Sequence, residues 1–260
     1  MSIRILEAFR FRKKDTWLHS LDPRTKFLLL MLFTSYSLGL SDPVSLLIIL
    51  LTEAAMLYSA QSLENWFYTL RGLVTILALI FILNLLTVTE DRLYVSSAMT
   101  LRFLTLTTAF SIFFLTTTPD EVATALEASG VSRDFTLMFS MSLRFVPTLA
   151  RDLQIIMDAL RSRGLELEKG GIRDRIRNYS YLLIPLIVYE LRRSLMIAEA
   201  LEARGFGYTK RVETYYTLTL GRRDYIVIGI FAASIIMLLL IHYLGYYTLF
   251  TEIVKKLFTI

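Results

Sequence analysis

The sequence contains no cysteine and only two histidines, His19 and His242, which lie far apart in the chain. The absence of thiols excludes disulfides, thiolate metal sites and cysteine nucleophiles, and two distant imidazoles offer little to zinc or haem. The phosphate-binding pattern Gly-x-x-x-x-Gly-Lys-Ser/Thr is also missing, as are His-Glu-x-x-His and paired Asp-rich boxes. We therefore expect no cofactor, no metal and no catalytic centre, which argues against an intramembrane enzyme.

Apolar residues are abundant: they make up 55% of the chain, and the mean hydropathy is +0.54. Soluble domains hold roughly 45–50% apolar residues. Apolar runs recur at residues 26–40, 43–60, 72–89 and 98–117, and a fifth covers residues 225–247. Each is near the roughly 20 residues that cross about 30 Å of hydrocarbon. The sequence therefore predicts an all-α integral membrane protein with about five transmembrane helices.

The charges gather between the fourth and fifth runs. Residues 119–223 hold 16 of the 28 lysines and arginines and no apolar run long enough to span, so we expect this insert in water or at the interface. Four spans return the chain to its starting side, and the positive-inside rule makes that side cytoplasmic. The net charge of +5 is then a topology signal, and nucleic acid is not an expected partner.

The expected organisation follows from these runs. Residues 1–25 form a basic cytoplasmic tail, residues 26–117 four transmembrane helices, and residues 118–223 a cytoplasmic helical insert. Residues 224–250 form the last transmembrane helix, and residues 251–260 a short external tail. The protein is thus a multi-pass protein of the cell membrane with a cytoplasmic N-terminus.

Three helices are predicted within the insert. A short one starts at Pro119 and stops before Gly130, because proline suits a first turn and glycine a helix end. A long amphipathic helix covers residues 133–163 with an expected kink at Pro147, and a second long helix covers residues 176–204. Both long helices are candidates to lie along an apolar surface.

The two long helices end alike, in Arg161-Ser162-Arg163-Gly164 and in Glu202-Ala203-Arg204-Gly205. Helix capping explains either ending alone, since glycine takes the left-handed position past a helix and arginine favours the negative helix end. An arginine on a rigid helix tip can in addition bind carboxylates or carbonyls in a partner's groove. Two such tips suggest a two-lobed partner. The candidate contact residues are Ser162, Arg163, Gly164, Ala203, Arg204 and Gly205.

In its motifs the sequence resembles the transmembrane T component of energy-coupling factor importers for vitamins and metal ions. The arginine-glycine endings stand where that family has paired Ala-Arg-Gly coupling motifs, although Ser162 replaces the usual alanine. Three further segments carry the resemblance: His19-Ser20-Leu21-Asp22-Pro23-Arg24-Thr25-Lys26, Leu143-Arg144-Phe145-Val146-Pro147 and Leu220-Gly221-Arg222-Arg223-Asp224-Tyr225.

The resemblance implies partners and a mechanism. The partners are two cytoplasmic ABC-type ATPases and a small membrane-embedded substrate-binding (S) subunit, and the T component itself binds neither ATP nor cargo. It passes ATP-driven motion through Arg163 and Arg204 to the S subunit, which delivers a vitamin or transition-metal ion. The rival hypothesis is a self-sufficient secondary transporter, but no internal repeat of the spans is visible.

Glu53 is the one acid plainly within a span, the second. A carboxylate there costs about 2.5–3.5 kcal/mol on insertion scales, so such residues are functional suspects by default. Two interpretations stay open: a neutral or paired packing residue, which we favour, and a residue that takes part in transport.

Overall fold

The computed structural model describes residues 16–89, 91–165, 171–208 and 220–243, with residues 252 and 254. Within these ranges every regular element is an α-helix, which confirms the all-α class. The basic tail up to residue 15, the end of the last span beyond residue 243 and the external tail, apart from residues 252 and 254, lie outside the described residues. The helices are α2 (Pro23–Gly39), α3 (Pro43–Ser59), α4 (Leu63–Thr87), α5 (Arg92–Thr116), α6 (Pro119–Ala128), α7 (Arg133–Ser162), α8 (Ile172–Ala203) and α9 (Arg222–Tyr243).

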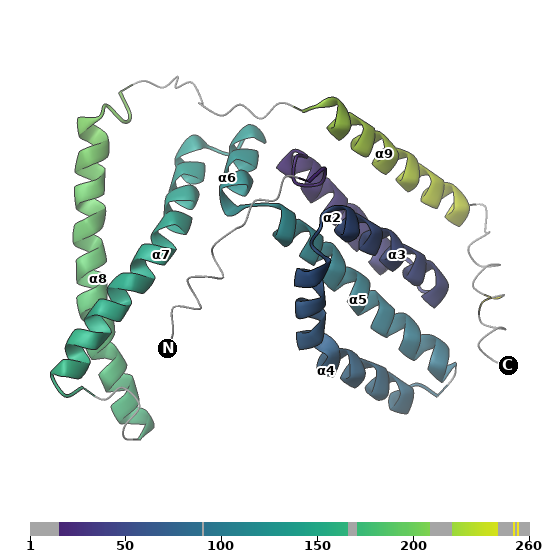
Figure 1. The fold of residues 1–260 in the computed structure, drawn as a ribbon, viewed down its shortest axis with the longest axis horizontal. Helices are drawn as coiled ribbons and strands as arrows, with labels where there is room; N and C mark the ends of the chain where they lie inside the picture. Colours follow the sequence, from purple (N-terminus) through teal and green to yellow (C-terminus); the bar gives the residue numbers. More distant parts are fainter. Residues whose placement is uncertain are drawn as a thin grey trace. The chain divides into compact units, whose positions relative to one another are not determined.

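The helices divide into two compact units. Helices α2 to α6 and α9 form one unit, which we call the bundle, and α7 and α8 form the other, which we call the hairpin (Figure 1). Helix α6 belongs to the bundle by its contacts with α2, although its sequence groups it with the charged helices that follow.

Local sequence fixes where three of the bundle helices begin. Helices α2 and α3 start with an aspartate cap followed by proline: Asp22 accepts from the Arg24 amide and Asp42 from the Ser45 amide. Both prolines stand at the start of a helix, where no amide donor is needed. Helix α6 starts with a capping box of Thr118 and Glu121. These caps supply partners to amides that have none within the helix.

Two of the described helices, α4 and α5, are long and apolar enough to cross a bilayer, and α3 is a shorter apolar helix. The start of the third span was predicted too late, since α4 begins at Leu63 rather than near residue 72. The first turns of α4 carry Glu64 and Arg71, which lower the local hydropathy without preventing helix formation. Hydropathy alone therefore marks the apolar part of this helix and misses its polar start.

Helix α5 is the centre of the bundle, because it packs against α2, α3 and α4. The apolar core joins Leu18 and Leu57 to Trp66 and Ile112, and a second cluster surrounds Phe33. Small hydroxyl side chains add polar links between helices. Ser37 of α2 donates to Thr105 of α5 at 2.8 Å, and the Trp66 indole of α4 donates to Thr108 at 3.2 Å. Such bonds satisfy polar groups inside an apolar bundle.

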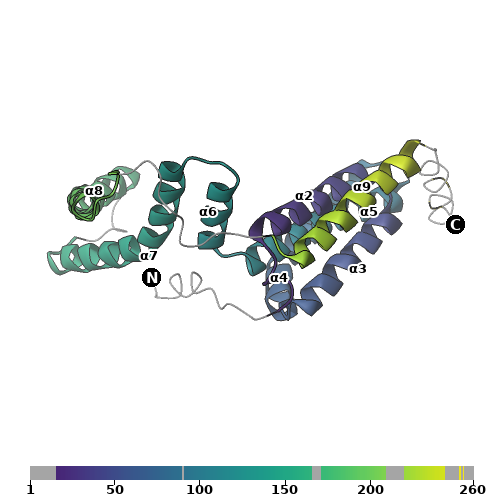
Figure 2. The same ribbon diagram turned by 90° about the horizontal axis from the view of Figure 1, so that it is seen from above.

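Helices α7 and α8 cross within the hairpin (Figure 1). Helix α7 ends within one residue of its predicted position, and α8 begins four residues earlier than the predicted residue 176. Pro147 lies inside α7, and Figure 2 shows this helix bent along its length. Pro185 similarly lies inside α8.

Candidate functional site

The end of α7 is built by a Schellman motif. The Leu165 amide donates to the Leu160 carbonyl at 3.0 Å, and the Gly164 amide donates to the Arg161 carbonyl at 2.9 Å. Gly164 has a φ of +85°, a left-handed conformation that costs a side chain strain. Arg163 is therefore the last residue before a sharp, hydrogen-bonded reversal of the chain.

The end of α8 repeats this geometry. The Phe206 amide donates to the Leu201 carbonyl at 3.0 Å, and the Gly205 amide donates to the Glu202 carbonyl at 2.8 Å, with a φ of +79° at Gly205. Arg204 has nearly the same backbone conformation as Arg163: φ and ψ are −88° and 6° against −89° and 11°. The matching sequences thus fold into matching tips.

The arginines at the two tips are available for a partner. Arg163 and Arg204 are exposed, and no hydrogen bond or ion pair joins either guanidinium to another described residue. Ser162 donates to the Asp158 carbonyl at 3.0 Å, so its hydroxyl is used within the helix. Ala203 and both glycines are exposed, and no atom lies within 4 Å of a Cβ built on either glycine. The six predicted residues therefore form two small, open helix ends, one on each hairpin helix.

The hairpin is fastened where its helices cross. Arg193 of α8 pairs with Asp152 of α7, and it also donates to Glu190 at 3.1 Å and stacks over the Tyr189 ring. The hydrogen bond to Asp152 raises the pKa of Arg193 above its ordinary value, so this guanidinium stays charged. The planar fork of arginine suits two carboxylates at once. No motif in the sequence predicted this pairing between residues 41 positions apart.

A second contact supports the tip of α8. The Arg133 guanidinium, at the start of α7, lies 5.8 Å from the centre of the Phe206 ring, directly after the tip. Such a cation–π contact stabilises by about 0.5–1 kcal/mol at an exposed site. It ties the chain that follows Gly205 to the opposite helix of the hairpin.

Glu53 lies inside the bundle on α3. Its side chain is fully buried, and among the described residues neither carboxylate oxygen has a hydrogen-bond partner. The structure therefore does not support a packing role in which Glu53 pairs with a polar group. A neutral packing residue and a residue that takes part in transport both remain possible interpretations of Glu53. Asn84 of α4 donates to the Ile80 carbonyl of its own helix, not to a neighbouring helix.

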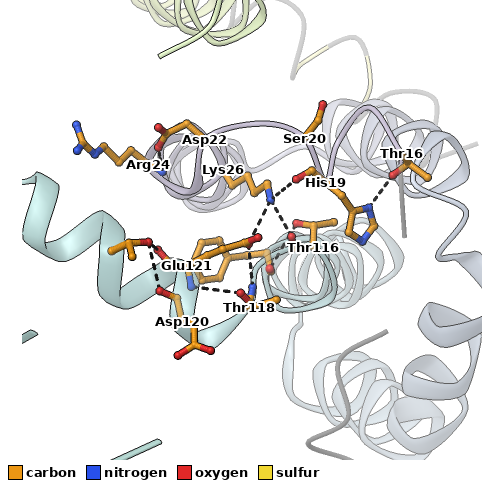
Figure 3. Close-up of polar contacts among 12 residues, drawn as sticks. Thr16, His19, Ser20, Asp22, Arg24, Lys26, Thr116, Thr118, Asp120 and Glu121 are labelled. Carbon is orange, nitrogen blue, oxygen red and sulfur yellow. Dashed lines mark hydrogen bonds and ion pairs between the residues drawn. The ribbon is translucent and has the colours of Figure 1, made fainter. Parts of the chain in front are cut away.

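A polar cluster that the sequence did not predict surrounds the start of α2 (Figure 3). Lys26 is buried, and its Nζ donates to the Thr116 carbonyl at 2.8 Å and to the His19 carbonyl at 3.1 Å. The same Nζ lies 3.8 Å from Glu121 Oε2 in the first turn of α6. One ammonium group thus meets the last turn of α5, the first turn of α6 and the turn before α2. The Arg24 side chain points away from this cluster (Figure 3).

Asp224, at the start of α9, reaches the same turn of α2. Its Oδ1 accepts from the Asp22 amide at 2.9 Å and its Oδ2 from the Gly221 amide at 2.9 Å. Both aspartates are buried. We call Asp22, Lys26, Glu121 and Asp224 the polar junction. Asp22 and Lys26 come from the first motif of the family resemblance and Asp224 from the last, whereas Glu121 lies in none of these motifs. For these three residues the resemblance is the one sequence signal that pointed to them.

Comparison with known proteins agrees with these motifs. A model of the family described as cobalt transport protein matches residues 14–216. The energy-coupling factor transporter transmembrane protein EcfT of Streptococcus thermophilus is 28% identical over 257 residues, 88% of this chain and 96% of that protein. The protein of the same name from Lactococcus lactis subsp. cremoris is 30% identical over 258 residues, again 88% and 96%. That from Exiguobacterium sibiricum is 35% identical over 179 residues, 58% of this chain and 68% of the relative.

The matched region contains the start of α2, Pro147 and both arginine-glycine tips, so the comparisons cover most of the residues that carry the resemblance. The chain therefore belongs to the cobalt transport protein family, as a transmembrane component of the energy-coupling factor transporters.

Proposed function

We propose that the chain is the coupling subunit of an ATP-driven importer, a non-catalytic part that joins two cytoplasmic ABC-type ATPases to a membrane-embedded S subunit. The cargo is a vitamin or a transition-metal ion carried by the S subunit. The observation that carries this proposal is the pair of matching helix ends, each of which presents an exposed, unpaired arginine among the described residues.

The chemistry of the tips fits this role. An arginine held by a Schellman motif has a fixed backbone, so binding orders its side chain without the further entropy cost of ordering the main chain. Its guanidinium can bind a carboxylate in two places at once or several carbonyls in a groove. Two tips of the same geometry suit two partners of the same kind, which favours a pair of similar ATPase subunits. The fastening of α7 to α8 by Arg193 lets the two tips act from one body.

The proposed topology puts the insert that contains α7 and α8 on the cytoplasmic side of the membrane. About five spans with a cytoplasmic N-terminus put the basic insert, residues 118–223, on the side where ATP is available. The amphipathic surfaces of α7 and α8 would then pass motion to the S subunit. Exposed apolar side chains on these helices supply such surfaces, among them Phe145, Leu149, Leu183 and Ile187.

Replacement of Arg163 and Arg204 by alanine, singly and together, tests the proposal. A desolvated charge-assisted contact in an interface is worth about 2–5 kcal/mol on truncation, whereas an exposed helix-end charge is worth under about 1 kcal/mol. We expect the double variant to insert normally and to lose most ATPase co-purification and ATP-driven uptake. The lysine variants should be partly active, because lysine lacks the planar fork.

Arg161→Ala is the matched control, since Arg161 is an exposed arginine in the last turn of α7 whose ion pair with Asp158 is long, at 4.0 Å. It should retain wild-type assembly. If the double variant is present at normal abundance in the membrane and still shows wild-type ATPase binding and uptake, the arginine-glycine ends only cap their helices and the proposal is wrong. Uptake by the chain alone, without ATPases, would instead favour a secondary transporter.

A further inference from the structure

The polar junction lies where the hairpin is attached to the bundle along the chain. Residues 129–132 connect α6 to α7, so α6 is the last bundle helix before the hairpin. After α8 the chain re-enters the bundle at α9. The two bundle helices that continue into the hairpin along the chain are therefore α6 and α9. Each contributes one residue to the polar junction: Glu121 from α6 and Asp224 from α9.

Both attachments converge on the first turn of α2. Lys26 holds the start of α6 and the end of α5, and the Asp22 amide holds the start of α9. The hydrogen bonds from Lys26 to the Thr116 carbonyl, at 2.8 Å, and from the Asp22 amide to Asp224, at 2.9 Å, are short and buried. The ion pair between Lys26 and Glu121 is longer, at 3.8 Å, and Glu121 is partly exposed, but Lys26 itself is only 3% exposed. Polar contacts of this kind are stronger away from water and costly to break, so they resist relative movement of the helices they join.

The charges also match the local helix dipoles. The Lys26 ammonium lies at the carboxyl end of α5, where carbonyls concentrate negative charge, and Glu121 lies in the first turn of α6, where amides concentrate positive charge. Glu121 also accepts from the Thr118 amide at 3.1 Å, so the same carboxylate caps α6 and faces Lys26. A shift of α6 away from α5 would separate Lys26 from one of its partners.

We propose that the first turn of α2 is the clamp through which displacement of the hairpin enters the bundle, with Lys26 as its positioning residue. This inference rests on the proposed coupling function. When the ATPases displace the hairpin tips, α6 is pulled along the chain, and Lys26 makes α6, α5 and α2 move as one body. Without Lys26, α6 pivots on its own and the motion is lost before it reaches the spans.

Distance measurements between α2 and α6 test the clamp directly. The chain has no cysteine, so Met31→Cys on α2 and Ala128→Cys at the end of α6 introduce the only two labelling sites, both exposed. Nitroxide labels at this pair report the separation of the helices by pulsed electron paramagnetic resonance. The labelled chain is measured in lipid nanodiscs with its ATPases and S subunit, without nucleotide and with trapped ATP.

With Lys26 in place, we expect one narrow distance distribution that changes by less than about 2 Å between the two states, because interface shifts of about that size mark a helix that moves. With Lys26→Met, the distribution should broaden or shift by more than about 2 Å when ATP binds. Lys26→Arg should restore most of the narrow distribution. ATPase co-purification should stay at the wild-type level, since the tips are unchanged.

Two further variants keep the test decisive. Glu121→Gln retains an oxygen for the α6 cap but removes the charge, so it should broaden the distance distribution less than Lys26→Met does. If Lys26→Met does not insert into the membrane, Glu121→Gln takes its place in the test. Asp120→Asn, which changes the neighbouring exposed acid, should behave as wild type. A Lys26→Met or Glu121→Gln chain with the wild-type distribution in both states would overturn the clamp, as would a large ATP-dependent change with Lys26 present.

The outcome is separable from that of the proposed function. If the ATPases fail to bind the unsubstituted labelled chain, the coupling function fails, and the comparison of Lys26 with Lys26→Met in the nucleotide-free chain still shows whether the junction holds α6. If the ATPases bind and the distributions do not differ, the clamp alone is wrong.

Discussion

Replacing Glu53 tests how the bundle tolerates a carboxyl group in its core. The side chain is fully buried, and its oxygens have no hydrogen-bond partner among the described residues. On the same helix, Leu46 and Leu57 are equally buried and apolar. A buried polar group left unsatisfied costs about 1–3 kcal/mol, so its replacement by leucine removes a penalty rather than an interaction.

The expected gain can be estimated from these two facts. Removal of the unsatisfied carboxyl should raise the free energy of unfolding by about 1–3 kcal/mol, and the change of side-chain shape should lower it by up to about 1.5 kcal/mol. We therefore expect Glu53→Leu to raise the free energy of unfolding by roughly 1 kcal/mol, which corresponds to about 2–4 °C in Tm for a chain of this size. Glu53→Gln keeps an unsatisfied amide, so its Tm should stay near that of the wild type.

The assay is thermal unfolding in detergent at one heating rate, followed by circular dichroism, together with uptake by the assembled transporter. Thr52→Leu is the matched control, because it adds an apolar side chain at an exposed neighbour and should change stability by less than about 0.5 kcal/mol. A lower Tm for Glu53→Leu would refute the reasoning, since it would show that the carboxyl makes a stabilising contact. Loss of uptake in an assembled Glu53→Gln transporter would assign Glu53 to transport.

Two further outcomes follow from the tips and from the topology. Gly164→Ala and Gly205→Ala should each destabilise the hairpin by about 1–2 kcal/mol through backbone strain alone, because no atom lies within 4 Å of the added Cβ. Gly72→Ala, in open space within α4 and without a positive φ, should not destabilise in the same unfolding measurement. A cysteine at Gly170 should react with an impermeant thiol reagent only after permeabilisation, and one at Ser41 should react from outside; reaction of both from outside would refute the predicted topology.

Local sequence predicted the helix ends that depend on neighbouring residues only. Proline and a capping side chain mark the starts of α3 and α6, and the glycines after Arg163 and Arg204 mark the ends of α7 and α8. Helix α2 carries the same start signal at Asp22 and Pro23, but its first turn was assigned to the tail because the apolar run begins at residue 26. These signals are reliable because a cap is made within one helical turn. Where no side chain caps the helix and the first turns carry polar residues, as in α4, α5 and α8, the predicted starts were late; α5 begins at Arg92 rather than near residue 98.

The amino-acid sequence by itself thus determined the all-α class, the apolar runs and the two arginine-glycine tips, because each follows from composition or from residues within a few positions of one another. Only the tertiary structure decided that Asp224 meets Asp22, that Lys26 joins α2 to α5 and α6, and that Arg193 joins α7 to α8. It also decided that Glu53 is buried without a partner among the described residues. The physical reason is distance along the chain: Asp22 and Asp224 are 202 residues apart, and no local propensity records which buried polar groups the packing of helices brings together.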